Sequence, residues 1–178
     1  MPARWQDYAM ENPKEVLREN LQSLRPHSSI GLTQQLRQLV QKLSPATIAS
    51  YQPMPVEPDV DEFNHWAANH SRLVFPRVIA DDLEFAQGPF SPGRFGIAEP
   101  IGPRVEQIDL VLVPALAIDL KGNRLGKGKG FYDRFLARFT GDCFAVVFDE
   151  EVLEQIPVEG HDQRVSGVIT PKRTILFD

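Results

Sequence analysis

Residues 108–113 read Ile-Asp-Leu-Val-Leu-Val, and Pro114 ends the run. Branched apolar residues fill every position except Asp109, which is typical of a central strand that is covered on both faces. A second run of this kind, Cys143-Phe-Ala-Val-Val-Phe148, follows a stretch with helical spacing. Strands that alternate with helices favour a parallel sheet with right-handed crossovers. We therefore predict an α/β fold, with an open, mostly parallel sheet between two layers of helices.

Apolar periodicity extends this pattern to both ends of the chain. It predicts helices at 12–24, 31–43, 60–67 and 131–139, and strands at 47–51, 72–79, 152–156, 165–169 and 174–177. In the first helix, Leu17, Leu21 and Leu24 are expected to form the buried stripe. Residues 87–103 contain several glycines and prolines around Phe90, Phe95 and Ile97, so we expect an ordered loop that forms a wall near a site.

The composition is that of a soluble globular protein. The chain has 178 residues, of which 42% are hydrophobic and 24% charged, and its net charge is -5. We expect residues 12–178 to form a single domain after a loosely ordered extension, residues 1–11. The acidity argues against a nucleic-acid partner, and the lack of a long apolar run or apolar leader argues against a membrane partner. The single cysteine, Cys143, excludes an internal disulfide and fits a reducing compartment, so we expect a cytoplasmic protein with an inert, buried thiol. We also expect a monomer.

A glycine-rich loop lies between the two buried strands. Residues 123–134 read Asn-Arg-Leu-Gly-Lys-Gly-Lys-Gly-Phe-Tyr-Asp-Arg. Glycine lets backbone approach a polyanion closely, and the lysines add positive charge, so the loop and the following helix could hold a phosphate group. An ordinary flexible turn is the alternative, since the loop matches neither the P-loop nor the dinucleotide-binding motif.

Further candidate residues lie far from this loop in the sequence. Lys14, Arg18 and Arg25 fall on one edge of the first predicted helix, where they form either a binding edge or a solvated surface. Glu57 lies in a loop stiffened by Pro55 and Pro58, after a predicted strand. A carboxylate there is well placed to contact a ligand, although an exposed surface glutamate is the alternative.

Several of these stretches, taken together and in order, resemble one enzyme family. They are Lys14 with Leu17-Arg18, the region around Glu57, Phe95-Gly-Ile-Ala-Glu-Pro100, Asp109 to Pro114, Asp119 to Gly122, Arg124 to Leu136, and Ile156 to Asp162. Their combination is similar to that of the 5-formyltetrahydrofolate cyclo-ligases, also called methenyltetrahydrofolate synthetases. The resemblance implies a three-layer fold like that of sugar-phosphate isomerases and CoA transferases. It also implies the ATP-dependent closure of 5-formyltetrahydrofolate to 5,10-methenyltetrahydrofolate, with release of ADP and phosphate.

The resemblance also implies roles for individual residues. The ATP-binding set is Lys14, Arg18, Arg124, Leu125, Gly126, Lys127, Gly128, Lys129, Gly130, Phe131 and Tyr132. Within it, Lys129, Arg124 and Lys127 would act on the transferred phosphoryl group. Asp133 and Asp162 match magnesium ligands, and Mg²⁺ would accompany ATP. Glu57 would hold the pterin, with Tyr132 and Phe131 on the folate side.

A few positions depart from the common family pattern. Ala115 and Ile118 stand where we expect glycine and an aromatic residue, which could change the packing against the pterin, and Lys129 adds charge near the phosphates. Two other functions remain open. One is a regulatory protein that binds folate or nucleotide without turnover, and the other is an RNA-associated protein that uses Lys121 to Arg138 as a basic patch.

Overall fold

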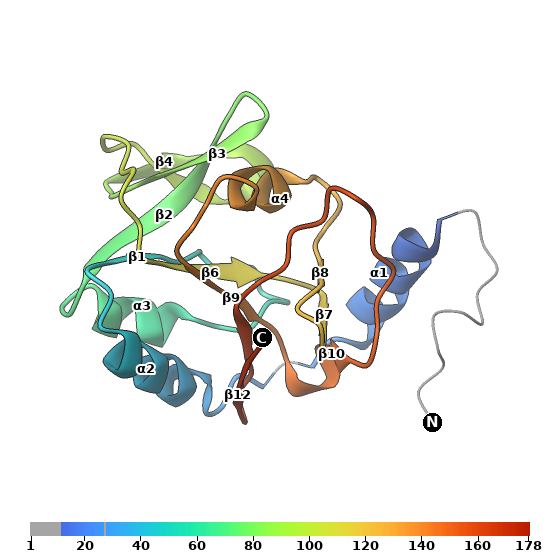
Figure 1. Ribbon diagram of the computed structural model, residues 1–178. Coiled ribbons are helices and arrows are strands. Elements are labelled where there is room, and N and C mark those ends of the chain that lie inside the picture. The colour runs from blue at the N-terminus through green and yellow to red at the C-terminus, as the bar shows by residue number, and fades with distance from the viewer. Residues whose placement is uncertain (1–11, 27) are drawn as a thin grey trace.

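A computed structural model describes residues 12–26 and 28–178 (Figure 1). Its main feature is a sheet of seven strands, in the order β12-β11-β9-β6-β1-β2-β3. These strands are β1 (Thr47–Ala49), β2 (Arg72–Ile79), β3 (Asp82–Ala86), β6 (Leu110–Pro114), β9 (Asp142–Val146), β11 (Gly167–Ile169) and β12 (Thr174–Leu176). The inner pairs, from β11 through β9, β6 and β1 to β2, are parallel, and the two edge pairs are antiparallel. The predicted mostly parallel α/β sheet is confirmed.

Helices cover both faces of this sheet, because the strand side chains alternate between two apolar cores. On one face, α2 (Leu32–Leu43) and α3 (Asp61–Ala67) pack against strand residues that include Leu110 and Leu112. On the other face, α4 (Phe131–Leu136) packs against a set that includes Val111 and Val113. The continuous apolar run of β6 is thus explained by burial on both sides.

A third, smaller core joins the N-terminal helix to the body of the protein. It lies beside a sheet with the order β10-β7-β8, formed by β10 (Val152–Leu153), β7 (Ala117–Asp119) and β8 (Arg124–Leu125). Leu17 and Leu21 of α1 (Pro13–Leu24) pack against buried residues of this region, including Leu116 and Leu125. In Figure 1, α1 accordingly lies next to β8 and away from the seven-stranded sheet. This contact brings α1 to the glycine-rich loop that follows β8.

Some predictions need correction. Leu24 is 77% exposed, because α1 ends there and the chain turns away before the apolar stripe continues. Arg25 does not share a helix edge with Lys14 and Arg18; it lies beyond the helix and forms a buried ion pair with Glu151.

The strand predictions were also incomplete. Residues 82–86 form β3. The predicted loop 87–103 contains a hairpin of β4 (Phe90–Pro92) and β5 (Ala98–Pro100), with a short 3-10 turn at Arg94–Gly96 between the two strands. A second 3-10 turn, Asp149–Glu151, follows β9. Pro76 lies inside β2, where β1 has already ended, so a strand pairs with β2 on only one side at this point. The predicted extension, residues 1–11, lies outside the described residues. None of the helices in the described ranges is both long and apolar enough to span a bilayer.

Candidate active site

A cavity of about 400 Å³ gathers the predicted site residues, and this volume is ordinary for a small-molecule pocket. It lies where the carboxyl end of β6 meets the glycine-rich loop, α1 and the strands β2, β3 and β5. Every residue predicted for the site lines it: Lys14, Arg18, Glu57, Arg124, Leu125, Gly126, Lys127, Gly128, Lys129, Gly130, Phe131, Tyr132, Asp133 and Asp162. Their individual roles stay predictions, but the residues that the sequence indicated do line one cavity.

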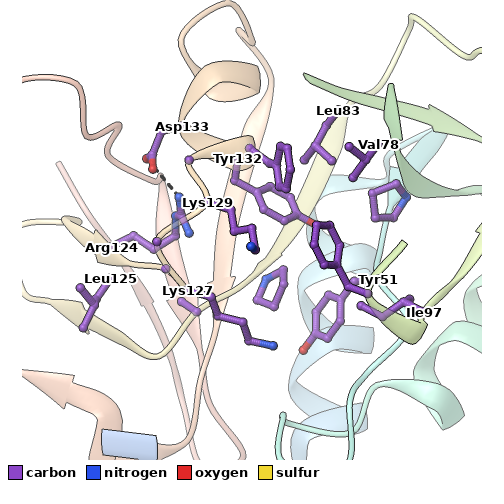
Figure 2. A pocket seen from close by; sticks show the side chains of 18 of the residues that line it. Tyr51, Val78, Leu83, Ile97, Arg124, Leu125, Lys127, Lys129, Tyr132 and Asp133 are labelled. Atoms are coloured by element: carbon purple, nitrogen blue, oxygen red, sulfur yellow. Dashed lines mark hydrogen bonds and ion pairs between the residues drawn. The ribbon is translucent and has the colours of Figure 1, made fainter. Parts of the chain in front are cut away.

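The two sides of the cavity differ in chemistry (Figure 2). Arg124, Lys127 and Lys129 lie on one side, and the apolar side chains of Val78 and Ile97 lie on the other. One end can therefore bind a polyanion while the other accommodates a flat, mostly apolar ring system.

The alternating glycines of the loop make room for arginine side chains. A Cβ atom on Gly126 would lie 2.8 Å from Nη1 of Arg124, and one on Gly128 would lie 3.3 Å from Cζ of Arg18. Gly128 has φ +94°, and the carbonyl oxygen of Gly126 accepts a hydrogen bond from Nε of Arg18 at 2.9 Å. The glycines thus allow guanidinium groups to lie against the loop backbone, which side chains at these positions would prevent.

Lys14 is buried among carboxylates on the α1 side of the cavity. Its Nζ lies 2.7 Å from Oε2 of Glu159, and 2.8 and 2.7 Å from Oδ1 and Oδ2 of Asp162. Burial on its own would raise the pKa of Asp162, but hydrogen bonds from Lys14 and from the Glu159 N–H leave this pKa below its ordinary value. For Glu159, the hydrogen bond from Lys14 lowers the pKa. Both carboxylates are thus held in the charged form.

Arg124 forms the second ion pair of the cavity, with Asp133. Nη2 of Arg124 donates to Oδ1 of Asp133 at 3.0 Å, and the same oxygen accepts from the Gln163 N–H at 3.2 Å. Nε of Arg124 is buried without a hydrogen-bond partner among the described residues. An unpaired buried donor is costly, so a shift of the Arg124 side chain that brings Nε to an acceptor would be favourable.

The third pair joins the glycine-rich loop to the opposite loop. Nζ of Lys127 lies 2.5 Å from Oε1 of Glu57 and 2.9 Å from Sδ of Met54, while Oε2 of Glu57 accepts from the Met54 N–H at 2.9 Å. The Glu57 side chain is only 5% exposed, so this carboxylate, which is predicted to bind the pterin, is buried and is not that of a surface glutamate.

Lys129 differs from the other loop lysine. Its Nζ lies 4.8 Å from the ring centroid of Phe95, and among the described residues it forms no ion pair with a carboxylate. Phe95 is 57% exposed and holds a left-handed backbone conformation, φ +61°, which is unusual for a residue with a side chain. The predicted ordered wall of residues 87–103 therefore reaches the cavity through Phe95, Ile97 and Glu99.

The phenol of Tyr132 and the thiol of Cys143 both stay protonated. Burial raises the pKa of the Tyr132 phenol well above its ordinary value, with a further contribution from the charge of Glu57, so it stays protonated. Burial raises the pKa of the Cys143 thiol to about 12, which makes it a poor nucleophile, as predicted.

Sequence reasoning missed several lining residues. Tyr51, Arg77, Val78 and Leu83 line the cavity, yet none of them stands in a local motif. Arg94 also lines it, from the predicted wall 87–103, although it was not named as a site residue. Glu159 and His161 also line the cavity. Both stand in the run Glu159-Gly-His161-Asp162, of which only Asp162 was predicted as a site residue. Of the two departures that concern the pterin, Ala115 lines the cavity, whereas Ile118 is fully buried in the core behind it and does not line the cavity.

The site also has oxygen donors that suit a hard divalent cation. One ligand atom each from Glu159, His161 and Asp162 lie within 4.8 Å of one another, and the ammonium group of Lys14 stands among the carboxylates as a cation. Magnesium is commonly held by one or two carboxylates plus phosphate oxygens and water, so Asp162 and Glu159 fit such an ion. Asp133 reaches the same cavity but bonds to Arg124 instead of joining this cluster.

Comparison with known proteins gives one consistent result. Residues 11–171 match the model of the 5-formyltetrahydrofolate cyclo-ligase family. A 5-formyltetrahydrofolate cyclo-ligase of Mycolicibacterium smegmatis is 38% identical over 152 residues, which is 76% of this chain and 78% of that protein.

Two solved structures share the fold. The NMR structure of the Aquifex aeolicus 5,10-methenyltetrahydrofolate synthetase has a TM-score of 0.79 and 28% identity, and the match covers 92% of each chain. The 5,10-methenyltetrahydrofolate synthetase of Mycoplasma pneumoniae has a TM-score of 0.73 and 26% identity, covering 91% of this chain and 99% of the other. The chain therefore belongs to the 5-formyltetrahydrofolate cyclo-ligase family and is an enzyme of the ligase class.

Proposed function

We propose that this protein converts 5-formyltetrahydrofolate to 5,10-methenyltetrahydrofolate, using ATP and releasing ADP and phosphate. The observation that carries the proposal is the meeting, in one cavity, of a glycine-rich loop with three cations and a buried carboxylate, Glu57, opposite it. Family membership supports the same reaction, because the similar proteins carry the names of this activity.

The chemistry needs an activated formyl oxygen, which is otherwise a poor leaving group. In the proposed reaction, this oxygen attacks the γ-phosphorus, the bond from that phosphorus to the ADP oxygen breaks, and an iminium phosphate forms. N10 then adds to the formyl carbon and loses its proton, and phosphate departs with the original formyl oxygen. The C–N bond to N10 closes the ring, so no covalent enzyme nucleophile is required.

Phosphoryl transfer asks the protein mainly for position and positive charge. Lys129 is the loop lysine without a carboxylate partner among the described residues, so we propose that it stabilises the transferred group most directly. Arg124, with its unpaired buried Nε, would hold the phosphates from the start of the loop. Lys127 would also contact the phosphates after leaving Glu57. Lys14 and Arg18 would complete the contacts from α1.

Mg²⁺ would supply charge neutralisation on the phosphate oxygens. We propose Asp162 and Asp133 as its ligands, where Asp133 would exchange its bond to Arg124 for the ion. Glu159 would join them, because its ligand atom lies within 4.8 Å of that of Asp162. For Asp162 to bind the ion, Lys14 must move from the carboxylates to a phosphate.

Glu57 would recognise the pterin. Its two carboxylate oxygens can accept from a ring N–H and an exocyclic amino group, which is the usual bidentate arrangement. Tyr132 and Phe131 would contact the ring system from the loop side, and Val78 and Ile97 from the other side.

We further propose that residues 12–178 act as one catalytic domain and that the enzyme is a monomer of the cytoplasm. The single cysteine, which cannot form an internal disulfide, is compatible with a reducing compartment.

A direct assay tests the proposed function. Purified protein is mixed with 5-formyltetrahydrofolate, Mg²⁺ and ATP, and the absorbance of methenyltetrahydrofolate is followed. We expect product formation that requires both ATP and Mg²⁺. Intact binding of both ligands without product would instead support the non-catalytic binding protein.

A further inference from the structure

We propose that Lys127 couples the two substrate sites, so that nucleotide binding strengthens folate binding by removing Lys127 from Glu57. This inference rests on the proposed function, because it takes ATP as the ligand of Lys127 and the pterin as the ligand of Glu57. It goes beyond that function by naming the single contact that makes the two binding events depend on each other.

Both carboxylate oxygens of Glu57 accept hydrogen bonds from the protein itself. Each carboxylate oxygen already has one donor, since Oε1 accepts from Lys127 Nζ and Oε2 accepts from the Met54 N–H. A pterin that offers two N–H donors needs both oxygens of Glu57 facing it. The Glu57 side chain is only 5% exposed, so the ammonium group of Lys127 covers the side from which a pterin must approach. The backbone donor at Met54 is fixed, whereas Lys127 is the end of a flexible side chain, so Lys127 is the group that moves aside.

An alternative position is available to Lys127. Its side chain is 41% exposed, and it extends from the loop whose neighbouring Arg18 and Arg124 also line the cavity. A phosphate held by this loop would attract the ammonium group away from Glu57. The nucleotide then carries part of the cost of breaking the ion pair, and the pterin meets a free carboxylate.

The coupling is reciprocal. If the nucleotide increases the affinity for folate by some factor, folate must increase the affinity for the nucleotide by the same factor. Lys129 provides the contrast, because it lies on the same loop but contacts the Phe95 ring and, within residues 12–26 and 28–178, no carboxylate. Removing Lys129 should impair turnover without changing the coupling.

The experiment is calorimetric titration of the full chain with 5-formyltetrahydrofolate, with and without Mg²⁺ and a non-hydrolysable ATP analogue. For the wild type, we expect the analogue to tighten folate binding by about fivefold or more. In Lys127→Met, which keeps an unbranched side chain one atom shorter and loses the charge, folate alone should bind at least about fivefold tighter than to the wild type. The analogue should then add no more than about twofold.

The matched controls are Lys129→Met, which should retain the wild-type coupling, and Lys127→Arg, which can still pair with Glu57 and should also retain it. Lys127→Gln provides a second neutral variant, and circular dichroism shows whether each variant is folded. Wild-type coupling in both neutral variants would overturn the proposal, as would weaker folate binding to them in the absence of nucleotide.

The outcomes separate this inference from the proposed function. Lys127-dependent coupling in a protein that forms no methenyltetrahydrofolate would support the inference and refute the reaction. Product formation with coupling that ignores Lys127 would do the reverse. No coupling in the wild type would also overturn the inference.

Discussion

Lys14 and Asp162, which are 148 positions apart in the chain, are joined by two hydrogen bonds, with Nζ 2.8 Å from Oδ1 and 2.7 Å from Oδ2. Both side chains are 8% exposed, so solvent screens this pair poorly. Asp162 is a proposed magnesium ligand and Lys14 a proposed phosphate ligand, so the pair holds the Asp162 carboxylate in its charged form until substrates separate the two groups.

The Lys14–Asp162 pair predicts how stability depends on pH. The pKa of Asp162 is lowered in the folded protein, so its carboxylate contributes stability above an ordinary aspartate pKa of about 4. This contribution is lost as the pH falls through the lowered pKa. We expect the wild type to lose more free energy of unfolding than Asp162→Asn between about pH 5 and pH 3. Urea unfolding at a series of pH values measures this, and parallel pH curves would contradict it.

Asp133→Asn tests the second proposed metal ligand. We expect the variant to need about tenfold more Mg²⁺ for half-maximal rate at a fixed ATP concentration, because a neutral amide is a weaker ligand for a hard cation. Magnesium titration of the initial rate is the measurement. Asp82→Asn is the control, since Asp82 pairs with Arg138 on the surface and should leave the titration unchanged. An unchanged titration in Asp133→Asn would leave Asp133 only as the partner of Arg124.

Gly128→Ala tests the fit of Arg18 against the loop. A Cβ would lie 3.3 Å from Cζ of Arg18, at a residue with φ +94°, so both the loop and the guanidinium must shift. We expect KM for ATP to rise by about tenfold, the size of one lost charge-assisted hydrogen bond, and stability to fall by about 1–2 kcal/mol. Initial rates and thermal unfolding measure the two effects.

Gly160→Ala is the matched control for this substitution. Gly160 is exposed, has no positive φ, and nothing lies within 4 Å of its added Cβ, so KM and stability should stay near wild type. Equal effects of the two substitutions would contradict the account of the loop.

Arg25→Met tests a buried pair that serves the fold and not the chemistry. Nε of Arg25 lies 2.6 Å from Oε1 of Glu151, and the side chains are 2% and 3% exposed. Removing the cation leaves a buried, unpaired carboxylate, so we expect a loss of about 3–5 kcal/mol in the free energy of unfolding. The folded fraction should keep its KM for both substrates, as Arg25 does not line the cavity.

Two further variants bracket this result, both measured by urea unfolding. Arg138→Met removes a half-exposed pair with Asp82 and should cost at most about 1 kcal/mol. Replacing both Arg25 and Glu151 by apolar residues should recover much of the loss, because neither charge is then left buried alone. A loss for Arg25→Met no larger than that for Arg138→Met would refute the predicted difference.

Much of the fold could be predicted from local pattern. The continuous apolar run of β6 reflects burial on two faces, and the helical periodicity of α2 reflects its packing on one face. Short edge elements such as β3 and β8 could not be predicted, because their pairing depends on strands distant in the chain. Leu24 fitted a helical stripe but lies exposed, since the third core ends before it.

The residues of the site could likewise be predicted from local pattern, whereas their pairing could not. Glycine spacing and the resemblance indicated which residues line the cavity, and the structure brings them together. The partners of the charges were not predictable, because Lys127 meets Glu57 across 70 positions and Lys14 meets Asp162 across 148. Such pairs depend on where the loops are placed by the whole sheet.

Oxygen labelling tests the central claim most directly. The protein is given 5-formyltetrahydrofolate with ¹⁸O in the formyl group, together with ATP and Mg²⁺, and the released phosphate is examined by mass spectrometry. If the formyl oxygen is phosphorylated in the Glu57 and glycine-loop cavity, one ¹⁸O atom should appear in each phosphate released with a methenyltetrahydrofolate. Unlabelled phosphate, with ¹⁸O released to water, would contradict the proposed reaction.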